Sequence, residues 1–217
     1  MERVGLFADG QRPKRILALG AHSDDLEIGC GGTIMRLAAE HCGLEVLWVV
    51  LSGTASRGTE ARASASSFLA GVPNVNVIVR EYEDRFFPYS GKEVKEEFEA
   101  LKGAFSPDLV FTHYRDDRHQ DHRLVSDLTW NTWRDHLILE YEIPKYDGDF
   151  GSPNFFAPLP AATLDRKIDL LLGHFPSQAG RHWFTADLFR AVARIRGMEC
   201  NAPDGFAEAF YARKARF

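Results

Sequence analysis

Short apolar runs that alternate with helical patterns are the feature of this chain that most limits its fold. Residues 15–21 (RILALGA) are apolar and are followed at once by polar residues and glycine, which is typical of a buried parallel strand. Further runs of this kind are residues 45–51, 76–79 and 108–113. Helical patterns follow at residues 32–42, 60–69, 92–105 and 123–134. This alternation predicts βαβ units, and therefore a Rossmann-like three-layer α/β sandwich with a mostly parallel sheet.

The second half of the chain is less regular. Residues 137–146 are expected to form a further strand or an edge segment, and residues 206–213 a late strand that runs antiparallel. Helices are expected at residues 164–175 and 186–196. Residues 148–160 are rich in glycine, proline and phenylalanine, which predicts a long loop that could act as a lid or substrate wall. A polar, small-residue loop is also expected at residues 52–58.

Composition restricts the classes of function that the chain can have. Its 217 residues suit a single domain over 1–217, and a hydrophobic fraction of 45% is enough for a packed core. The net charge of −5 and the lack of a basic stripe argue against a nucleic-acid partner. No apolar run has the length of a membrane-spanning helix, and the first 15 residues lack a signal-peptide core. The three cysteines show no pairing pattern, which favours a reducing compartment, with the cytoplasm as the default. Both a monomer and a homo-oligomer are compatible with the sequence.

The first polar cluster, 20-GAHSDDLEIGCGGT-33, lies at the end of the first predicted strand. His22 and Asp25 are three residues apart in a strand-to-helix turn, so their side chains can converge above the sheet edge. Asp24 adjoins Asp25, and the two carboxylates repel each other unless a positive charge lies between them. A purely structural role is equally compatible with these acids, because aspartates satisfy the free N–H groups at a helix N-terminus. The glycines could also form a phosphate cradle, although the pattern is neither GxGxxG nor a P-loop.

The second cluster, 113-HYRDDRHQDHR-123, follows the fourth predicted strand and leads into a helix. Ligands of such folds bind beyond the carboxyl ends of the strands, so both clusters should face the same crevice. His119 and His122 are separated by a glutamine and by Asp121. Imidazole nitrogens and a carboxylate oxygen suit Zn²⁺, and three protein ligands leave the fourth position open for water. Each cluster is therefore expected to supply part of a hydrolytic metal site.

Together the two clusters resemble the zinc-dependent N-deacetylases of the LmbE/PIG-L-like family, whose signatures have the forms AHPDDxE and HxDH. The resemblance is strong over about residues 14–135 and loose beyond them. Ser23 stands where proline is common in the first signature. The resemblance implies one Zn²⁺ per chain and an active site at the carboxyl ends of the strands.

Carried over to this sequence, the resemblance implies that His22, Asp25 and His122 bind zinc. Asp24 would be the general base that takes a proton from the attacking water. His119 would stabilise the oxyanion or donate a proton to the leaving amine.

The resemblance also implies two supporting roles. Asp121 would orient one of the imidazoles, although a first-turn acid in the helix is nearly as good an explanation. Arg62 would contact the substrate, whereas a solvated helix face is the favoured interpretation for Arg57. His113 could line the pocket or be structural, and Asp117 is expected to pair with Arg118. The segment 177-SQAGRHWF-184 is expected to be a turn with its aromatic residues in the core.

These features predict a metal-dependent hydrolase of linear amides. Its expected reaction is removal of the acetyl group from an N-acetylated amino sugar or glycoconjugate of the GlcNAc type. An alternative is a Rossmann-like nucleotide-binding protein whose glycines cradle phosphate, but such a protein has no need of the HQDH cluster. A third possibility keeps the metal and changes the reaction to hydrolysis of another amide or of a phosphoester, although two-metal phosphoesterases usually need more carboxylates.

Overall fold

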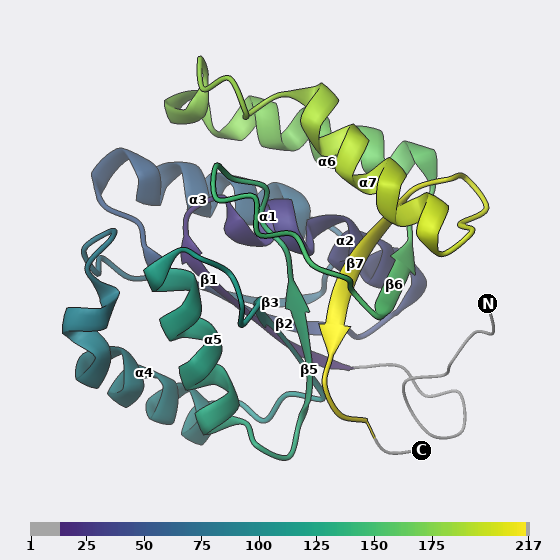
Figure 1. Ribbon diagram of the computed structural model, residues 1–217. Coiled ribbons are helices and arrows are strands. Elements are labelled where there is room, and N and C mark those ends of the chain that lie inside the picture. The colour runs from purple at the N-terminus through teal and green to yellow at the C-terminus, as the bar shows by residue number, and fades with distance from the viewer. Residues whose placement is uncertain (1–13, 216–217) are drawn as a thin grey trace.

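A single seven-stranded sheet forms the centre of the computed structural model, which describes residues 14–215 (Figure 1). The strands are β1 (Arg15–His22), β2 (Glu45–Ser52), β3 (Asn74–Val79), β4 (Leu109–His113), β5 (Leu137–Tyr141), β6 (Phe155–Pro158) and β7 (Ala207–Ala212). Their order in the sheet is β3-β2-β1-β4-β5-β7-β6. Strands β1 to β5 are parallel, while β7 runs antiparallel to β5 and to β6. The predicted mostly parallel sheet is confirmed. The expectation that the first 15 residues lack a signal-peptide core falls mainly on residues 1–13, which lie outside the described range.

Helices cover both faces of the sheet (Figure 1). They are α1 (Asp25–Gly29), α2 (Gly31–Glu40), α3 (Ala55–Phe68), α4 (Gly91–Ala104), α5 (Gln120–Thr132), α6 (Ala161–His174) and α7 (Ala186–Glu199). Two short 3₁₀ helices are η2 (Phe87–Ser90) and η3 (Pro176–Gln178). Helices α4 and α5 pack on one face, and the other five lie on the opposite face. In residues 14–215 no helix is both long and apolar enough to cross a membrane.

The alternation of side chains along β1 explains why both faces are covered. Ile16 and Ala18 belong to the core under α2, α3, α6 and α7, whereas Leu17 and Leu19 belong to the core under α4 and α5. All four side chains are completely buried. A strand between two helical layers has no solvent-facing side, so its sequence is a continuous apolar run. Burying an isoleucine or leucine side chain, such as Ile16, Leu17 or Leu19, contributes about 1.5–3 kcal/mol.

Three of the predicted segments differ from the structure. The expected loop at residues 52–58 is wrong from Ala55 onward, because α3 already begins there. Its glycines serve close packing instead of chain flexibility: a Cβ on Gly58 would lie 2.5 Å from the carbonyl oxygen of Gly53. The expected loop at residues 148–160 contains the edge strand β6, and β5 is an interior strand that ends at Tyr141. The antiparallel strand expected at residues 206–213 is confirmed as β7.

Candidate active site

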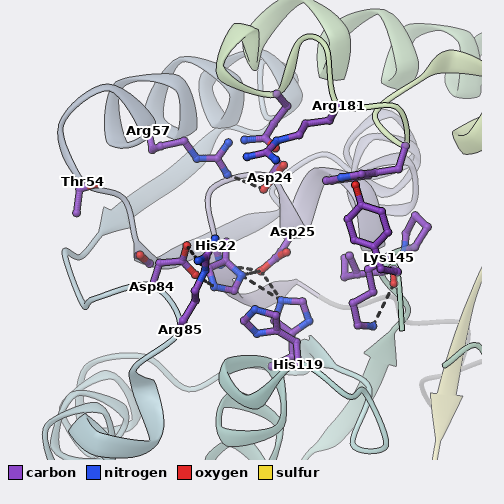
Figure 2. Close-up of a pocket in the computed structure, with 17 residues that line it drawn as sticks. His22, Asp24, Asp25, Thr54, Arg57, Asp84, Arg85, His119, Lys145 and Arg181 are labelled. Atoms are coloured by element: carbon purple, nitrogen blue, oxygen red, sulfur yellow. Dashed lines mark hydrogen bonds and ion pairs between the residues drawn. The ribbon is translucent and has the colours of Figure 1, made fainter. Parts of the chain in front are cut away.

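A cavity of about 440 Å³ opens at the carboxyl edge of the parallel strands (Figure 2). His22 enters it from the end of β1, and Ser52 from the end of β2. His119 and His122 reach it from the start of α5, directly after β4. The sheet topology therefore brings the two polar clusters together, as the sequence predicted, although they are about 100 residues apart in the chain.

Three side-chain atoms from the two clusters form a nearly equilateral triangle. His22 Nδ1 lies 3.4 Å from Asp25 Oδ2 and 3.1 Å from His122 Nε2. The third side, from His122 Nε2 to Asp25 Oδ2, measures 3.6 Å. In a tetrahedral site with metal–ligand bonds of 2.0–2.2 Å, two ligand atoms are about 3.3–3.6 Å apart. The residues present therefore fit a zinc-sized cation, and all three line the cavity.

Wider groups of donors surround this triangle. His22, His119 and His122 offer ligand atoms within 4.8 Å of one another, and so do His22, Asp84, His119 and Asp121. His113 could join Asp25 and His122 in the same way. However, the backbone N–H of Ala21 donates to Nε2 of His113, and the imidazole is fully buried and stacked on the His122 ring. His113 therefore belongs to the floor beneath the cluster.

Electrostatics favour a cation at this position. Burial by itself would lower the pKa of His22, but the charge of Asp25 and hydrogen bonds to Asp121 and Asp84 outweigh it and hold that pKa well above its ordinary value. Burial, together with the neighbouring His113, lowers the pKa of His122 to about 3. His122 is therefore a neutral imidazole at pH 7, which is the form that binds metals.

Asp24 lies beside the triangle and is almost completely buried. Its Oδ1 is 2.9 Å from Nη2 of Arg57, which also lines the cavity. Burial raises the pKa of Asp24 above its ordinary value, even though the Arg57 guanidinium acts in the opposite direction. A carboxylate with a raised pKa is a better proton acceptor than an exposed one.

The carboxylate of Asp121 lies next to His22 and is held by two backbone N–H groups. Its Oδ2 accepts a hydrogen bond from the backbone N–H of Arg85 at 2.6 Å, and its Oδ1 accepts one from the N–H of Phe87 at 3.2 Å. The same Oδ2 lies 3.1 Å from Nε2 of His22. Arg85 has a φ of 73°, a left-handed conformation that is strained for a residue other than glycine. The strained turn at Arg85 thus directs a backbone N–H toward the carboxylate of Asp121, and this carboxylate orients the imidazole of His22.

His119 occupies the N-cap of α5, where its Nδ1 accepts a hydrogen bond from the backbone N–H of Asp121. The imidazole lines the cavity, and its centre lies 4.9 Å from that of His22. Burial and the nearby His22 lower the pKa of His119. Because the His119 ring lines the cavity beside His22, it can reach a group bound next to the triangle of His22, Asp25 and His122.

Asp117 is a site residue whose contacts sequence reasoning missed. Its Oδ2 lies 2.9 Å from Nδ1 of His122 and 2.8 Å from Nζ of Lys145, and its Oδ1 accepts a hydrogen bond from the backbone N–H of His119. The expected partner, Arg118, instead donates its backbone N–H to Asp149. The position of Asp117 inside the second cluster was the available signal, but Lys145 comes from the segment after β5 and could not be assigned as its partner.

The positions of two arginines of α3 differ from the expectation. Arg62 lies on the exposed face of the helix, contacts the carbonyl of Val79, and does not line the cavity. Arg57 lines it. Five residues of α-helix turn the chain by about 140° net, so both side chains cannot face the same cavity.

The cavity walls also differ from expectation. Residues 148–160 do not line it; residues 143–146 and the turn around Arg181 and Trp183 do. Trp183 is half-buried at the wall, while Phe184 is in the core, as expected for that turn. Asp84, after β3, is a further lining residue that the sequence pattern did not reveal.

Fold and site define an α/β protein with a candidate cation site at the carboxyl edge of a mostly parallel sheet. Residues 17–133, more than half of the chain, match the model of the PIG-L family, which is described as GlcNAc-PI de-N-acetylase. The chain belongs to this family. The resemblance seen in the two sequence clusters is thereby confirmed.

The chain is also similar to individual proteins. The uncharacterized deacetylase YaiS of Escherichia coli strain K12 is 28% identical over 150 residues, which cover 64% of this chain and 80% of YaiS. The N,N'-diacetylchitobiose deacetylase from Pyrococcus horikoshii has a similar fold, with a TM-score of 0.71 at 22% identity over 92% of this chain and 84% of that one. The 4-carboxy-2-hydroxymuconate hydratase GalB from Pseudomonas putida KT2440 gives the same TM-score at 18% identity, over 94% and 98% of the two chains. The fold is therefore shared by proteins named for different reactions.

Proposed function

We propose that this protein is a zinc-dependent N-deacetylase that hydrolyses the acetamide of an N-acetylated amino sugar or glycoconjugate of the GlcNAc type. The observation that carries the proposal is the ligand triangle of His22, Asp25 and His122 beside the buried carboxylate of Asp24. Membership of the PIG-L family supports the choice of an acetamide as the scissile group.

His22, Asp25 and His122 would hold one zinc ion per chain. When bound, zinc polarises a carbonyl oxygen and lowers the pKa of water to about 7, which makes a nucleophile available at neutral pH. Asp121 and Asp117 keep the two imidazoles in orientation through their second ring nitrogens, as carboxylates commonly do for metal-binding histidines.

Asp24 is the residue that we assign as the general base. Its carboxylate takes the proton of the attacking water, and burial gives it the raised pKa that this step favours. His119 lines the same cavity, where it stabilises the developing oxyanion or donates a proton to the leaving amine.

The substrate contacts follow from the cavity walls. Arg57 lies above His22 and Asp84 beside it in Figure 2, and they offer a planar donor and an acceptor to the cavity. Such a pair suits the hydroxyl groups of a sugar ring. Trp183 provides an aromatic surface at the wall. The volume of about 440 Å³ lies within the range of small-molecule sites.

The glycines of the first cluster argue against the nucleotide-binding alternative. The carboxylate of Glu208 already accepts the N–H groups of Gly32 and Thr33 at 2.8 and 2.6 Å. A Cβ on Gly31 would lie 2.6 Å from the ring of Phe68. The N-terminus of α2 is therefore occupied by the protein itself and leaves no place for a phosphate group.

Organisation and location complete the proposal. We infer a single domain, because one sheet joins strands from Arg15 to Ala212. We also infer a cytoplasmic protein, in keeping with three free cysteines that include the exposed Cys42.

Acetate release is the direct test. The protein would be assayed with N-acetylated monosaccharides, nucleotide sugars and lipid- or peptide-linked sugars, before and after chelation and with zinc restored. We expect acetate only from the zinc-loaded protein, and most from a GlcNAc-type substrate. Best turnover on an amide without a sugar would refute the amino-sugar assignment and leave an amidohydrolase.

A further inference from the structure

Arg181 is an exposed cation of the cavity wall and has no counterion within residues 14–215. The four cationic residues that line the cavity are Arg57, Arg85, Lys145 and Arg181. Three of them form ion pairs, namely Arg57 with Asp24, Arg85 with Asp84, and Lys145 with Asp117. For the guanidinium of Arg181, residues 14–215 provide neither a hydrogen bond nor an ion pair. An unpaired guanidinium at the wall of a binding cavity is suited to an anionic group of the ligand.

The turn that carries Arg181 is fixed to the rest of the fold. Phe175 and Phe184, on either side of it, are buried in the core. Ser177 donates its backbone N–H and its hydroxyl to Glu60 of α3, at 2.9 and 2.5 Å. Within the turn, the N–H of Phe184 donates to the carbonyl of Arg181. The backbone of Arg181 is therefore set by packing, and only its side chain extends toward the cavity (Figure 2).

The surroundings of Arg181 suit a sugar that carries the anion. Trp183 and Tyr146 line the same cavity, and Tyr146, which is 70% exposed, has its hydroxyl 3.4 Å from Nδ1 of His182. Aromatic faces of this kind pack against the apolar side of a sugar ring.

We propose that the substrate is an N-acetylated amino sugar bearing a carboxylate or a phosphate, and that Arg181 binds this anionic group. The inference rests on the proposed function, because it takes the acetamide to lie at His22, Asp25 and His122. With the acetamide there, the rest of the substrate extends past Arg57 toward Arg181, which lie on the same side of the cavity (Figure 2). Arg181 thus selects among N-acetyl sugars and takes no part in the chemical step.

The test compares one charge-removing variant with a matched control. Arg181→Gln removes the cation at the wall, and Arg166→Gln makes the same change on the exposed side of α6, away from the cavity. The probes are methyl N-acetylglucosaminide as the neutral sugar, N-acetylglucosamine 1-phosphate and 6-phosphate, and N-acetylmuramic acid as the carboxylate. Binding is measured by calorimetry with each arginine change made in zinc-loaded Asp24→Asn protein, in which turnover is slow, and kcat/KM is measured by acetate release with Asp24 intact.

We expect Arg181→Gln to weaken binding of the preferred anionic sugar by about 10- to 100-fold, the value of a charge-assisted hydrogen bond, and to change the neutral sugar less than about twofold. Arg166→Gln should leave both unchanged. Whether a phosphate or the muramic acid shows the larger loss identifies the anion. The proposal is overturned if Arg181→Gln binds every anionic sugar as tightly as the wild type does. It is also overturned if Arg181→Gln loses affinity equally for neutral and anionic sugars. If no sugar releases acetate, the proposed function fails, while the calorimetric comparison still decides the role of Arg181.

Discussion

Asp117 and His122 form a buried carboxylate–imidazole pair, with Oδ2 of Asp117 2.9 Å from Nδ1 of His122. The pair leaves Nε2 of His122 as the nitrogen that completes the triangle with His22 and Asp25. Lys145 holds the carboxylate from the other side at 2.8 Å. The orientation of one corner of the candidate metal site thus depends on a residue that does not belong to the triangle.

Asp117→Asn should therefore weaken metal binding without removing any ligand. The amide cannot reproduce both the contact with His122 and that with Lys145, and loss of such a supporting carboxylate costs about 10- to 100-fold in metal affinity. Zinc affinity would be measured by competition with a chromophoric chelator. Asp116→Asn, at the exposed neighbouring position, is the matched control. An unchanged zinc affinity in Asp117→Asn would show that His122 is oriented by other contacts.

Removal of the metal should lower the thermal stability of the protein. A cation that binds only the folded state adds about 2.7 kcal/mol when its free concentration is 100 times its Kd. For a chain of about this size, that free energy corresponds to roughly 5–11 °C in Tm. Differential scanning calorimetry before and after chelation, with zinc restored, checks this. A Tm that does not respond to zinc in the wild type would argue against a site in the folded protein.

The strands and both polar clusters could be predicted from the sequence because each is encoded locally. A buried strand is a short apolar run, and the clusters directly follow two such runs. The choice between Arg57 and Arg62 could not be predicted, since it depends on where α3 begins and hence on the rotation of each side chain. Asp84, Lys145 and Arg181 come from separate connecting segments, and only tertiary packing brings them to the cavity. Strand β6 was hidden because its pairing partner, β7, lies about 50 residues later.

Lys167→Met should destabilise the fold strongly. Lys167 Nζ lies 2.6 Å from Glu208 Oε1, and both side chains are almost completely buried. The carboxylate of Glu208 also accepts a hydrogen bond from the backbone N–H of Gly32 at the start of α2. Removing one partner leaves an uncompensated buried charge, which costs about 3–5 kcal/mol. Urea denaturation measures the change. Arg190→Ala, which breaks an exposed pair with Asp165, should cost less than about 1 kcal/mol, and equal effects of the two variants would contradict the assigned role of burial.

Glu140 should make stability depend on pH. Burial raises the pKa of Glu140, although contacts with the backbone of Arg115, with Arg213 and with Trp130 act against it. The folded state therefore holds this proton more tightly than the unfolded chain, so the contribution of Glu140 is greatest at acidic pH. It is lost as the pH rises through the raised value. The free energy of unfolding of the wild type, relative to Glu140→Gln, should decrease between pH 4 and pH 7. A relative stability that increases over this range would refute the raised pKa.

Bound zinc and acetate release, measured on the same preparations of three proteins, test the central claim most directly. For the wild type we predict about one zinc per chain and acetate release from a GlcNAc-type substrate. Asp24→Asn should keep its zinc while turnover falls by about 10²- to 10⁴-fold, because only the proton acceptor is lost. His22→Ala should lose both zinc and turnover. Near-full turnover in Asp24→Asn, or zinc bound by His22→Ala as tightly as by the wild type, would contradict the assignment of this site.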